Sequence, residues 1–567
     1  GLSHSTNVFA NYSKGFFQFS TRSRSGVTIA FDGNSPLRPT QITVTDAATG
    51  APINPYDINN APLTSAGAAS YQANATQRSA FANARRDFFG RVPLAVKTGL
   101  DIRQAVRDRR RRDTPTFTFV GADGRPGSAD DGAAVVMDQD LSQLPAPYGF
   151  PSMGWVSNKA LVDLYKAHPG YFLLDEVGSY NTEVTASQYA EEIISSAYLR
   201  GDAQFFDRRL KLVGGVRAEQ TNVKGEGMLT DRTRNQQRDA TGKLILDANG
   251  RPIPITTSPL EAAKLTNVDR GLHTKKEYLR WFPSLNASFD VRPNLIARVG
   301  YYWSIGRPNL GQYGGTLTIP DPESPPSASN RFSVNNAGIK AWNARSTKAT
   351  LEYYFGRVGI LSVGAFRRDI DNFFVSTTFK ATPEFLALYG LRSDIYDGYD
   401  VVSQINSPNK VRMEGYNVSY KQSLTFMPEW ARGVQVFANY SALRAIGPGA
   451  NDFAGYIPRT VNWGVSLSRS KYDLKINWNF RDRARTSLYT GASIGPGTYS
   501  WDGRRLYIDA SADYYLSKRI ALFVSVRNLN DASVDFEVWG PSTPQMARLS
   551  SREENGGSWV LGVKGSF

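Results

Sequence analysis

Short segments of strictly alternating side chains recur along this chain of 567 residues. In one of them, Leu474, Ile476, Trp478 and Phe480 alternate with lysine, asparagine and arginine. Because strand side chains change face at every residue, such a segment has one apolar and one polar face. Similar segments occur at 92–103, 210–217, 295–304, 461–468, 506–515 and 558–567. Their length, about ten residues, is what a tilted strand needs to cross a bilayer.

The connections between these segments alternate in length. Short turns are expected near 87–91, 201–207, 291–294, 356–358, 428–432, 469–472 and 517–519. Long polar stretches lie between them, at about 109–187, 224–275, 306–342, 371–410, 446–457, 486–503 and 530–556. Tight turns at one rim and long loops at the other are typical of a transmembrane barrel. A soluble sandwich also has alternating strands, but it has no reason to separate its loops by length.

The hairpins also predict the size of the barrel. Seven hairpins and the last strand give fifteen strands, and the segments 8–10, 16–19 and 27–30 should add one to three more. We therefore predict an all-β fold, a transmembrane antiparallel up-and-down β-barrel of about 16–18 visible strands with long extracellular loops. An open edge in lipid would leave backbone groups unpaired. The last strand should therefore pair with the earliest strand of the intact protein.

The composition argues against several classes of function. No run of about 18 apolar residues occurs, which excludes transmembrane helices. The absence of cysteine excludes disulfides and thiolate metal sites. With three histidines and no HExxH or P-loop motif, we expect no enzyme, no catalytic residue, no metal and no cofactor. A barrel hydrolase, the enzymatic alternative, would need a nucleophile beside one of the two histidines in predicted loops, His168 and His273.

Two charged clusters in or beside the first predicted loop leave alternatives open. A basic run at a strand end is either solvated or bound to nucleic acid or anionic headgroups; it consists of Arg107, Arg109, Arg110, Arg111 and Arg112. We expect no nucleic-acid partner. A carboxylate cluster is either solvated or a calcium site; it consists of Asp123, Asp130, Asp131, Asp138 and Asp140. Ser157 and Thr382 should each cap a short loop helix, over 157–166 and 382–389.

Several segments together carry motifs of one family of membrane barrels. The segment Trp281-Phe282-Pro283-Ser284-Leu285-Asn286 is similar to the Leu-Pro-Ser-Leu-Asn strand of the family. An Arg-Pro-Asn sequence follows at 307–309, and hairpins similar to those of the family lie at 351–374 and 414–441. The sequence at 526–531 and the terminal Phe567 complete the set. Together these segments, over about residues 190–567, resemble the barrel of TonB-dependent outer-membrane receptors.

The resemblance implies a role for the last strand. Trp559, Leu561, Val563 and Phe567 share one face of this strand. An aromatic carboxy-terminal residue resembles the closing strand of bacterial outer-membrane barrels. By this resemblance, the four residues serve barrel closure and recognition by the barrel-assembly machinery.

The resemblance also implies a function and a location. The protein is expected to be a receptor for active transport in the outer membrane of a Gram-negative bacterium. It would bind a scarce or bulky nutrient at its extracellular loops, about 109–187 and 224–275, and import it with energy from the TonB inner-membrane complex. Ferric siderophores, cobalamin and oligosaccharides all fit as ligands. The alternative is a passive porin-like or surface-adhesion barrel without energy coupling.

Two features of the family are not recognisable in this sequence. Family members have an N-terminal plug with a box that engages TonB, and their barrels have about 22 strands. We therefore expect residues 1–567 to form the barrel domain, without the plug and possibly without the first strands. The expected partners are outer-membrane lipid, the small-molecule or oligosaccharide ligand, and TonB through the plug region.

Overall fold

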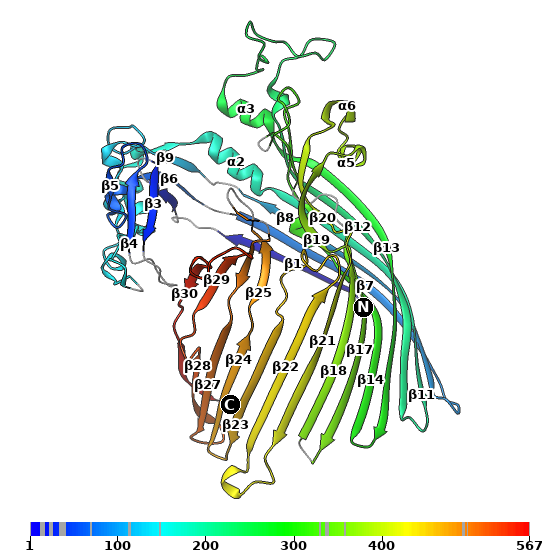
Figure 1. The fold of residues 1–567 in the computed structure, drawn as a ribbon. Coiled ribbons are helices and arrows are strands. Elements are labelled where there is room, and N and C mark those ends of the chain that lie inside the picture. The colour runs from blue at the N-terminus through cyan, green and yellow to red at the C-terminus, as the bar shows by residue number, and fades with distance from the viewer. Residues whose placement is uncertain are drawn as a thin grey trace.

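The fold is built on one large antiparallel sheet whose strands follow one another in chain order (Figure 1). The computed structural model describes residues 2–11, 17–21, 26–32, 41–68, 71–111, 115–146, 149–327, 330–334, 340–356, 359–489, 494–495 and 497–565. The sheet has 20 strands, of which four belong to loops and the other sixteen form the barrel wall. No helix within the described ranges is long and apolar enough to cross a membrane.

The sixteen wall strands form seven hairpins, flanked by one further strand at each end. They are β1 (Leu2–Asn11), β7 (Tyr71–Phe88), β8 (Leu94–Arg110), β11 (Gln188–Phe205), β12 (Leu210–Asp231), β13 (Asn267–Arg292), β14 (Leu295–Gly306), β17 (Trp342–Phe355), β18 (Gly359–Asp371), β21 (Val411–Ser423), β22 (Val434–Ile446), β23 (Arg459–Ser468), β24 (Tyr472–Arg481), β27 (Arg505–Tyr515), β28 (Ile520–Arg527) and β31 (Ser558–Gly565). All seven predicted short turns join neighbouring strands at one rim, which confirms the up-and-down barrel topology.

The strand registers separate an apolar face of the wall from a polar one. One row of directly paired residues crosses nine strands, from β13 to β27, and every member is apolar or aromatic; it runs Phe289, Ala297, Leu351, Val363, Val418, Tyr440, Val461, Phe480, Leu506. The row one position away in register contains only polar residues and glycine; it runs Ser288, Arg298, Thr350, Gly364, Asn417, Ser441, Thr460, Arg481, Arg505. We assign the first row to the lipid face and the second to the lumen.

At the two ends of the wall, β1 pairs with β7 and β31 pairs with β28. No register within the described residues joins β31 to β1. Closure through the earliest strand of the intact protein therefore stays a prediction. Of the three N-terminal segments expected to add barrel strands, only 8–10 lies in the wall, within β1. The other two lie in β2 (Phe17–Thr21) and β3 (Val27–Asp32), which belong to separate small sheets.

Much of the connection from β1 to β7 folds together with the loop between β8 and β11. The first sheet of this N-terminal module contains β2, β6 (Leu63–Ala68), β9 (Thr116–Phe119) and β10 (Phe172–Leu174); the second contains β3, β4 (Gln41–Asp46) and β5 (Pro52–Ile53). Leu63, Phe119 and Leu161 are fully buried in its core, which includes helix α1 (Asn158–Ala167). The module lies beside the long-loop rim, and α2 (Glu176–Ala186) leads from it back to the wall (Figure 1). The sequence predicted the second of these two connections as a long loop, but not the first.

A second folded region stands above β12 and β13, which extend far beyond the length that a bilayer requires (Figure 1). It contains β15 (Leu317–Ile319), β16 (Phe332–Val334), β19 (Phe374–Lys380) and β20 (Asp400–Asn406), with helices α3 (Pro259–Thr266), α5 (Pro383–Leu388) and α6 (Ser393–Tyr396) nearby. Parallel pairings of β12 with β15 and of β16 with β20 hold loops together that are distant in sequence. Phe332, Leu386 and Val401 are buried at its centre. Two predicted loops, 306–342 and 371–410, thus form one structure.

A third loop sheet lies at the same rim, above β24, β27 and β28 (Figure 1). It consists of β25 (Ala484–Leu488), β26 (Tyr499–Asp502), β29 (Val534–Trp539) and β30 (Leu549–Glu553). The two predicted loop helices are confirmed. Ser157 accepts a hydrogen bond from the Ala160 amide at the start of α1, and Thr382 accepts one from the Phe385 amide at the start of α5.

Candidate functional site

The inner face of the wall carries a chain of ion pairs where β8, β11 and β12 rise toward the long loops. Asp101 contacts Arg103 at 2.7 Å and Arg217 at 3.1 Å. The Arg217 guanidinium also donates to Glu219 at 2.6 Å. Glu219 in turn accepts a hydrogen bond from Arg307, which enters from the loop after β14. Because each guanidinium lies against a carboxylate, the network ties β8, β12 and the loop after β14 together with little net charge.

The loop after Arg307 lies directly against this wall. Helix α4 (Leu310–Tyr313) contacts β11 and β12, and Tyr313 is buried against Ala190 and Val223. Two glycines of β12 make this approach possible: a Cβ atom at Gly225 would lie 2.0 Å from the carbonyl oxygen of Tyr313, and one at Gly227 would lie 1.8 Å from that of Gly315. A side chain at either position would push the loop away from the wall.

Beneath α4, the ion-pair network ends among buried hydroxyl groups and one carboxylate. Glu192 lies 3.8 Å from Arg307, high on β11 and beyond the membrane-spanning part. Burial raises the pKa of the Glu192 carboxyl, although the charge of Arg307 opposes the shift. Burial also raises the pKa of the Tyr278 and Tyr313 hydroxyls, which therefore remain protonated at neutral pH. The inner wall thus offers neutral hydroxyl donors beside a carboxylate and an arginine.

The sheet of β25, β26, β29 and β30 carries a second candidate site, made of aromatic rings and arginines. Trp501 and Trp539 stack with ring centroids 4.4 Å apart and an interplanar angle of 6°. The guanidinium carbons of Arg548 and Arg483 lie 4.9 and 5.6 Å from the Trp539 ring centroid. That of Arg485 lies 4.5 Å from the Tyr499 ring centroid. Stacked rings and guanidinium groups suit planar or anionic ligands. We call this group the aromatic crown.

The two loops predicted to bind ligand are largely folded. The loop at 109–187 belongs mostly to the N-terminal module, and its apolar side chains are used for packing. The loop at 224–275 is shorter than predicted, because β12 continues to Asp231 and β13 begins at Asn267. The sequence analysis missed both the inner-wall network and the aromatic crown. Each depends on residues distant in sequence, although Trp501, Trp539 and Arg548 are visible in the two last long loops.

The two histidines of the enzymatic alternative lie on different elements of the fold. His168 ends helix α1 and stacks on Tyr171, with ring centroids 4.7 Å apart. His273 was expected in a loop but lies on β13, with its Nδ1 3.9 Å from a Glu226 carboxylate oxygen. His168 thus packs at the end of a helix, and His273 lies on the surface of a strand.

The carboxylates of the first long loop mostly accept hydrogen bonds from nearby backbone. Asp130 accepts from the amides of Ala122 and Asp123, and Asp131 accepts from those of Gly127 and Ser128. Asp138 accepts from two amides farther along the loop. No group of three acidic or histidine side chains in the described part of the chain has a metal-binding arrangement.

The basic run lies at the end of β8, as the sequence predicted. Arg110 lies 3.7 Å from Asp108 and 3.8 Å from Asp269, and Arg270 of β13 pairs with Asp108 as well. Two carboxylates therefore compensate part of this charge. Arg112 lies outside the described residues.

The terminal strand presents its apolar side chains outward. Trp559, Leu561 and Val563 of β31 are 64%, 76% and 66% exposed, while their backbone pairs with β28. Phe567 lies outside the described residues. Their role in closure and assembly stays a prediction.

Comparison with known proteins identifies the class of this barrel. Residues 4–529 match the family described as TonB dependent receptor-like, beta-barrel. The match spans most of the chain, so the protein belongs to this family of receptors and transporters. Proteins of the family lie in the outer membrane of Gram-negative bacteria, and this location applies to the present chain. No curated protein sequence matches it.

The solved structures that are similar to this chain include an import receptor, a transporter and a siderophore receptor. The closed form of the ferric-catecholate import receptor Fiu from E. coli K12 aligns with a TM-score of 0.52 and 13% identity, over 99% of this chain and 64% of Fiu. The unliganded ferric citrate transporter FecA aligns with a TM-score of 0.48 and 10% identity, over 99% of this chain and 61% of FecA. The siderophore receptor PirA from Acinetobacter baumannii aligns with a TM-score of 0.47 and 11% identity, over 100% of this chain and 62% of PirA. The chain thus spans less than two thirds of these proteins, and at this identity the likeness to Fiu concerns the fold alone.

Proposed function

We propose that the protein is an outer-membrane receptor for active transport, which captures a scarce or bulky nutrient at its extracellular mouth and imports it with energy from the TonB complex. Membership of the TonB-dependent receptor family is the observation that carries the proposal. In this proposal TonB acts through a plug region, and the ligand is a small molecule or an oligosaccharide. The protein performs no covalent chemistry on its cargo.

The chemistry of the mouth supports a capture function. The aromatic crown provides half-buried, stacked indole rings beside three guanidinium groups. The inner-wall network provides hydrogen-bond donors and a carboxylate at the entrance of the lumen. A planar or anionic ligand held by the crown would meet these groups as it moves inward. The loops 109–187 and 224–275 surround the same mouth and remain proposed parts of the ligand site.

Uptake by intact cells tests the proposal. The probes are a ⁵⁵Fe-labelled catecholate siderophore, radiolabelled cobalamin and a fluorescent maltooligosaccharide, each supplied to cells that express the complete protein. Trp539→Ala should raise the concentration for half-maximal uptake of the accepted probe about 2- to 10-fold, since an aromatic pair contributes about 0.5–1.5 kcal/mol. Trp281→Ala is the matched control, because Trp281 lies on the outer face and is 56% exposed. Equal effects of both substitutions would contradict a ligand site at the crown.

Energy dependence distinguishes the proposal from its alternative, a passive porin-like or adhesive barrel. Uptake through the proposed receptor should stop when a protonophore collapses the inner-membrane potential or when TonB is deleted. Uptake that persists under both conditions would favour the passive barrel. Cell-surface attachment without any uptake would favour the adhesive one.

A further inference from the structure

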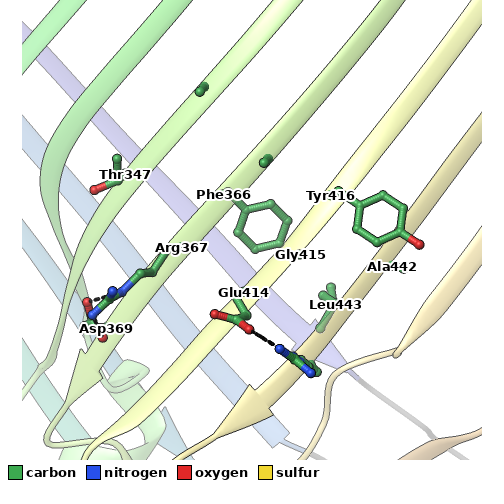
Figure 2. A pocket seen from close by; sticks show the side chains of 12 residues that line it. Thr347, Phe366, Arg367, Asp369, Glu414, Gly415, Tyr416, Ala442 and Leu443 are labelled. Carbon is green, nitrogen blue, oxygen red and sulfur yellow. Dashed lines mark hydrogen bonds and ion pairs between the residues drawn. The ribbon is translucent and has the colours of Figure 1, made fainter.

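The outer face of the wall contains a hollow that lies apart from the ligand site proposed above. It has a volume of about 890 Å³ and lies across β17, β18, β21 and β22 (Figure 2). Its floor is one row of directly paired residues: Ala349, Ala365, Tyr416 and Ala442. Three of these four side chains are methyl groups, so the floor is recessed. Tyr416 is 50% exposed and stacks on Tyr440, with ring centroids 5.8 Å apart.

This hollow lies on the lipid side of the wall. Its floor is two residues along each strand from the apolar row that includes Leu351, Val363 and Val418, and therefore on the same face. The next row toward the long loops is that of Thr347 and Arg367, which pairs with Tyr301 on β14. Tyr301 in this row is exposed, and an exposed tyrosine on the outer face marks the membrane–water interface. The hollow thus faces the acyl chains of the outer leaflet, immediately below its headgroups.

Charged side chains form the edge of the hollow that lies nearer the long loops. Glu414 accepts hydrogen bonds from Arg444 at 2.7 and 2.9 Å, and Asp369 accepts one from Arg367 at 3.1 Å (Figure 2). Arg412 donates to the same Asp369 at 2.9 Å. A second hollow of about 470 Å³ adjoins the first and shares Thr347, Arg367 and Asp369 with it. The apolar floor therefore continues toward the long loops into a polar recess.

The polar recess and its edge carry more positive than negative groups. Five basic side chains, of Arg345, Arg367, Lys410, Arg412 and Arg444, surround three carboxylates, of Asp369, Asp371 and Glu414. A guanidinium has five N–H donors, and pairing with one carboxylate leaves some of them free for another anion. Arg367 and Arg444 have side chains that are 51% and 73% exposed, so these donors are accessible from the membrane.

We propose that this outer groove binds one membrane lipid with a phosphate headgroup. An acyl chain lies on the alanine floor beside Tyr416, and the phosphate accepts hydrogen bonds from Arg367 and Arg444 at the edge. An anion fits the surplus of positive charge, and a chain fits the recessed apolar floor below it. Neither feature alone selects a lipid with a phosphate headgroup, but their order along the membrane normal does. The inference does not depend on which nutrient the protein transports.

Native mass spectrometry of the full chain in detergent micelles tests the proposal. The probes are dioleoyl phosphatidic acid, dioleoylglycerol, which has the same chains without phosphate, and inorganic phosphate. We expect one phosphatidic acid to bind at least about 10-fold more tightly than dioleoylglycerol, and inorganic phosphate not to compete at millimolar concentration. The double substitution Arg367→Gln with Arg444→Gln should remove this preference. Ala365→Trp should fill the floor and weaken both lipids.

Arg298→Gln is the matched control, because Arg298 lies in the polar luminal row and pairs with Glu352 at 3.1 Å. It should leave lipid binding unchanged, and heat-modifiable migration on gels shows that each variant is folded. Equal binding of phosphatidic acid and dioleoylglycerol would overturn the role of the arginines. Competition by inorganic phosphate would show an anion site without a lipid. Unchanged binding in Ala365→Trp would show that the chain lies elsewhere on the barrel.

Discussion

A single charge placed on the lipid face tests the register of the wall most directly. Ile476 lies midway along β24, four residues after Tyr472 at the short turn, so we expect it near the middle of the membrane. Its side chain lines an apolar hollow on the outer face together with Val465, Ala510 and Val524. Lys475, one residue away, belongs to the luminal face, where a charge at the same depth is solvated.

Ile476→Arg should therefore destabilise the barrel by about 2–4 kcal/mol, the range for arginine at the bilayer midplane. This corresponds to a change of about 30- to 700-fold in the folding equilibrium constant. Asn477→Arg is the comparison, since Asn477 projects toward the lumen beside Gly464, which leaves it space. We expect its cost to be much smaller, because a longer polar side chain can extend into water.

Folding titrations in guanidinium chloride with lipid vesicles, followed by tryptophan fluorescence, measure both variants. The free energy of unfolding should fall for Ile476→Arg and change little for Asn477→Arg. Equal losses would refute the assignment of faces, because they would place both side chains in the same medium. A larger loss for Asn477→Arg would show that the register is inverted.

Two further predictions concern the end of the chain and the inner wall. Deletion of Phe567 should lower the amount of heat-modifiable barrel in outer membranes, and undiminished assembly would show that the last residue carries no assembly signal. Burial raises the pKa of Glu192, so the folded state binds more protons than the unfolded state between the ordinary and the raised value. Stability should fall as pH rises through this window, and thermal unfolding of Glu192→Gln between pH 4 and 8 should lack that step. Parallel pH profiles for the two proteins would contradict this assignment.

The barrel wall could be predicted from the sequence because its signals are local. Alternation over ten residues defines each strand, and loop lengths define the two rims, so all seven hairpins were predicted at their observed places. The caps of α1 and α5 were also readable, since Ser157 and Thr382 bond to amides only three residues away. These features depend on neighbours in sequence, not on the closed fold.

The structure of the loops could not be predicted because it depends on distant partners. Strands β15 and β16 have three residues each, too few for a period to be recognised. They form because Leu317 pairs with Leu229 and Phe332 pairs with Val401, far away in the chain. For the same reason, 16–19 and 27–30 gave strand signals but no indication that they would leave the barrel for smaller sheets. The aromatic crown likewise joins Trp501 and Trp539 from different loops.

The polar and apolar faces of the wall are linked, because the side chains of each strand alternate between them. Thr350 and Leu351 are neighbours in β17, yet the first lies in a row of polar residues across nine strands and the second in an apolar one. A shift of one residue in any strand would exchange its faces and bring arginines such as Arg298 or Arg481 into lipid. Because that exchange is penalised on every strand at once, the register is held by lipid outside and water inside.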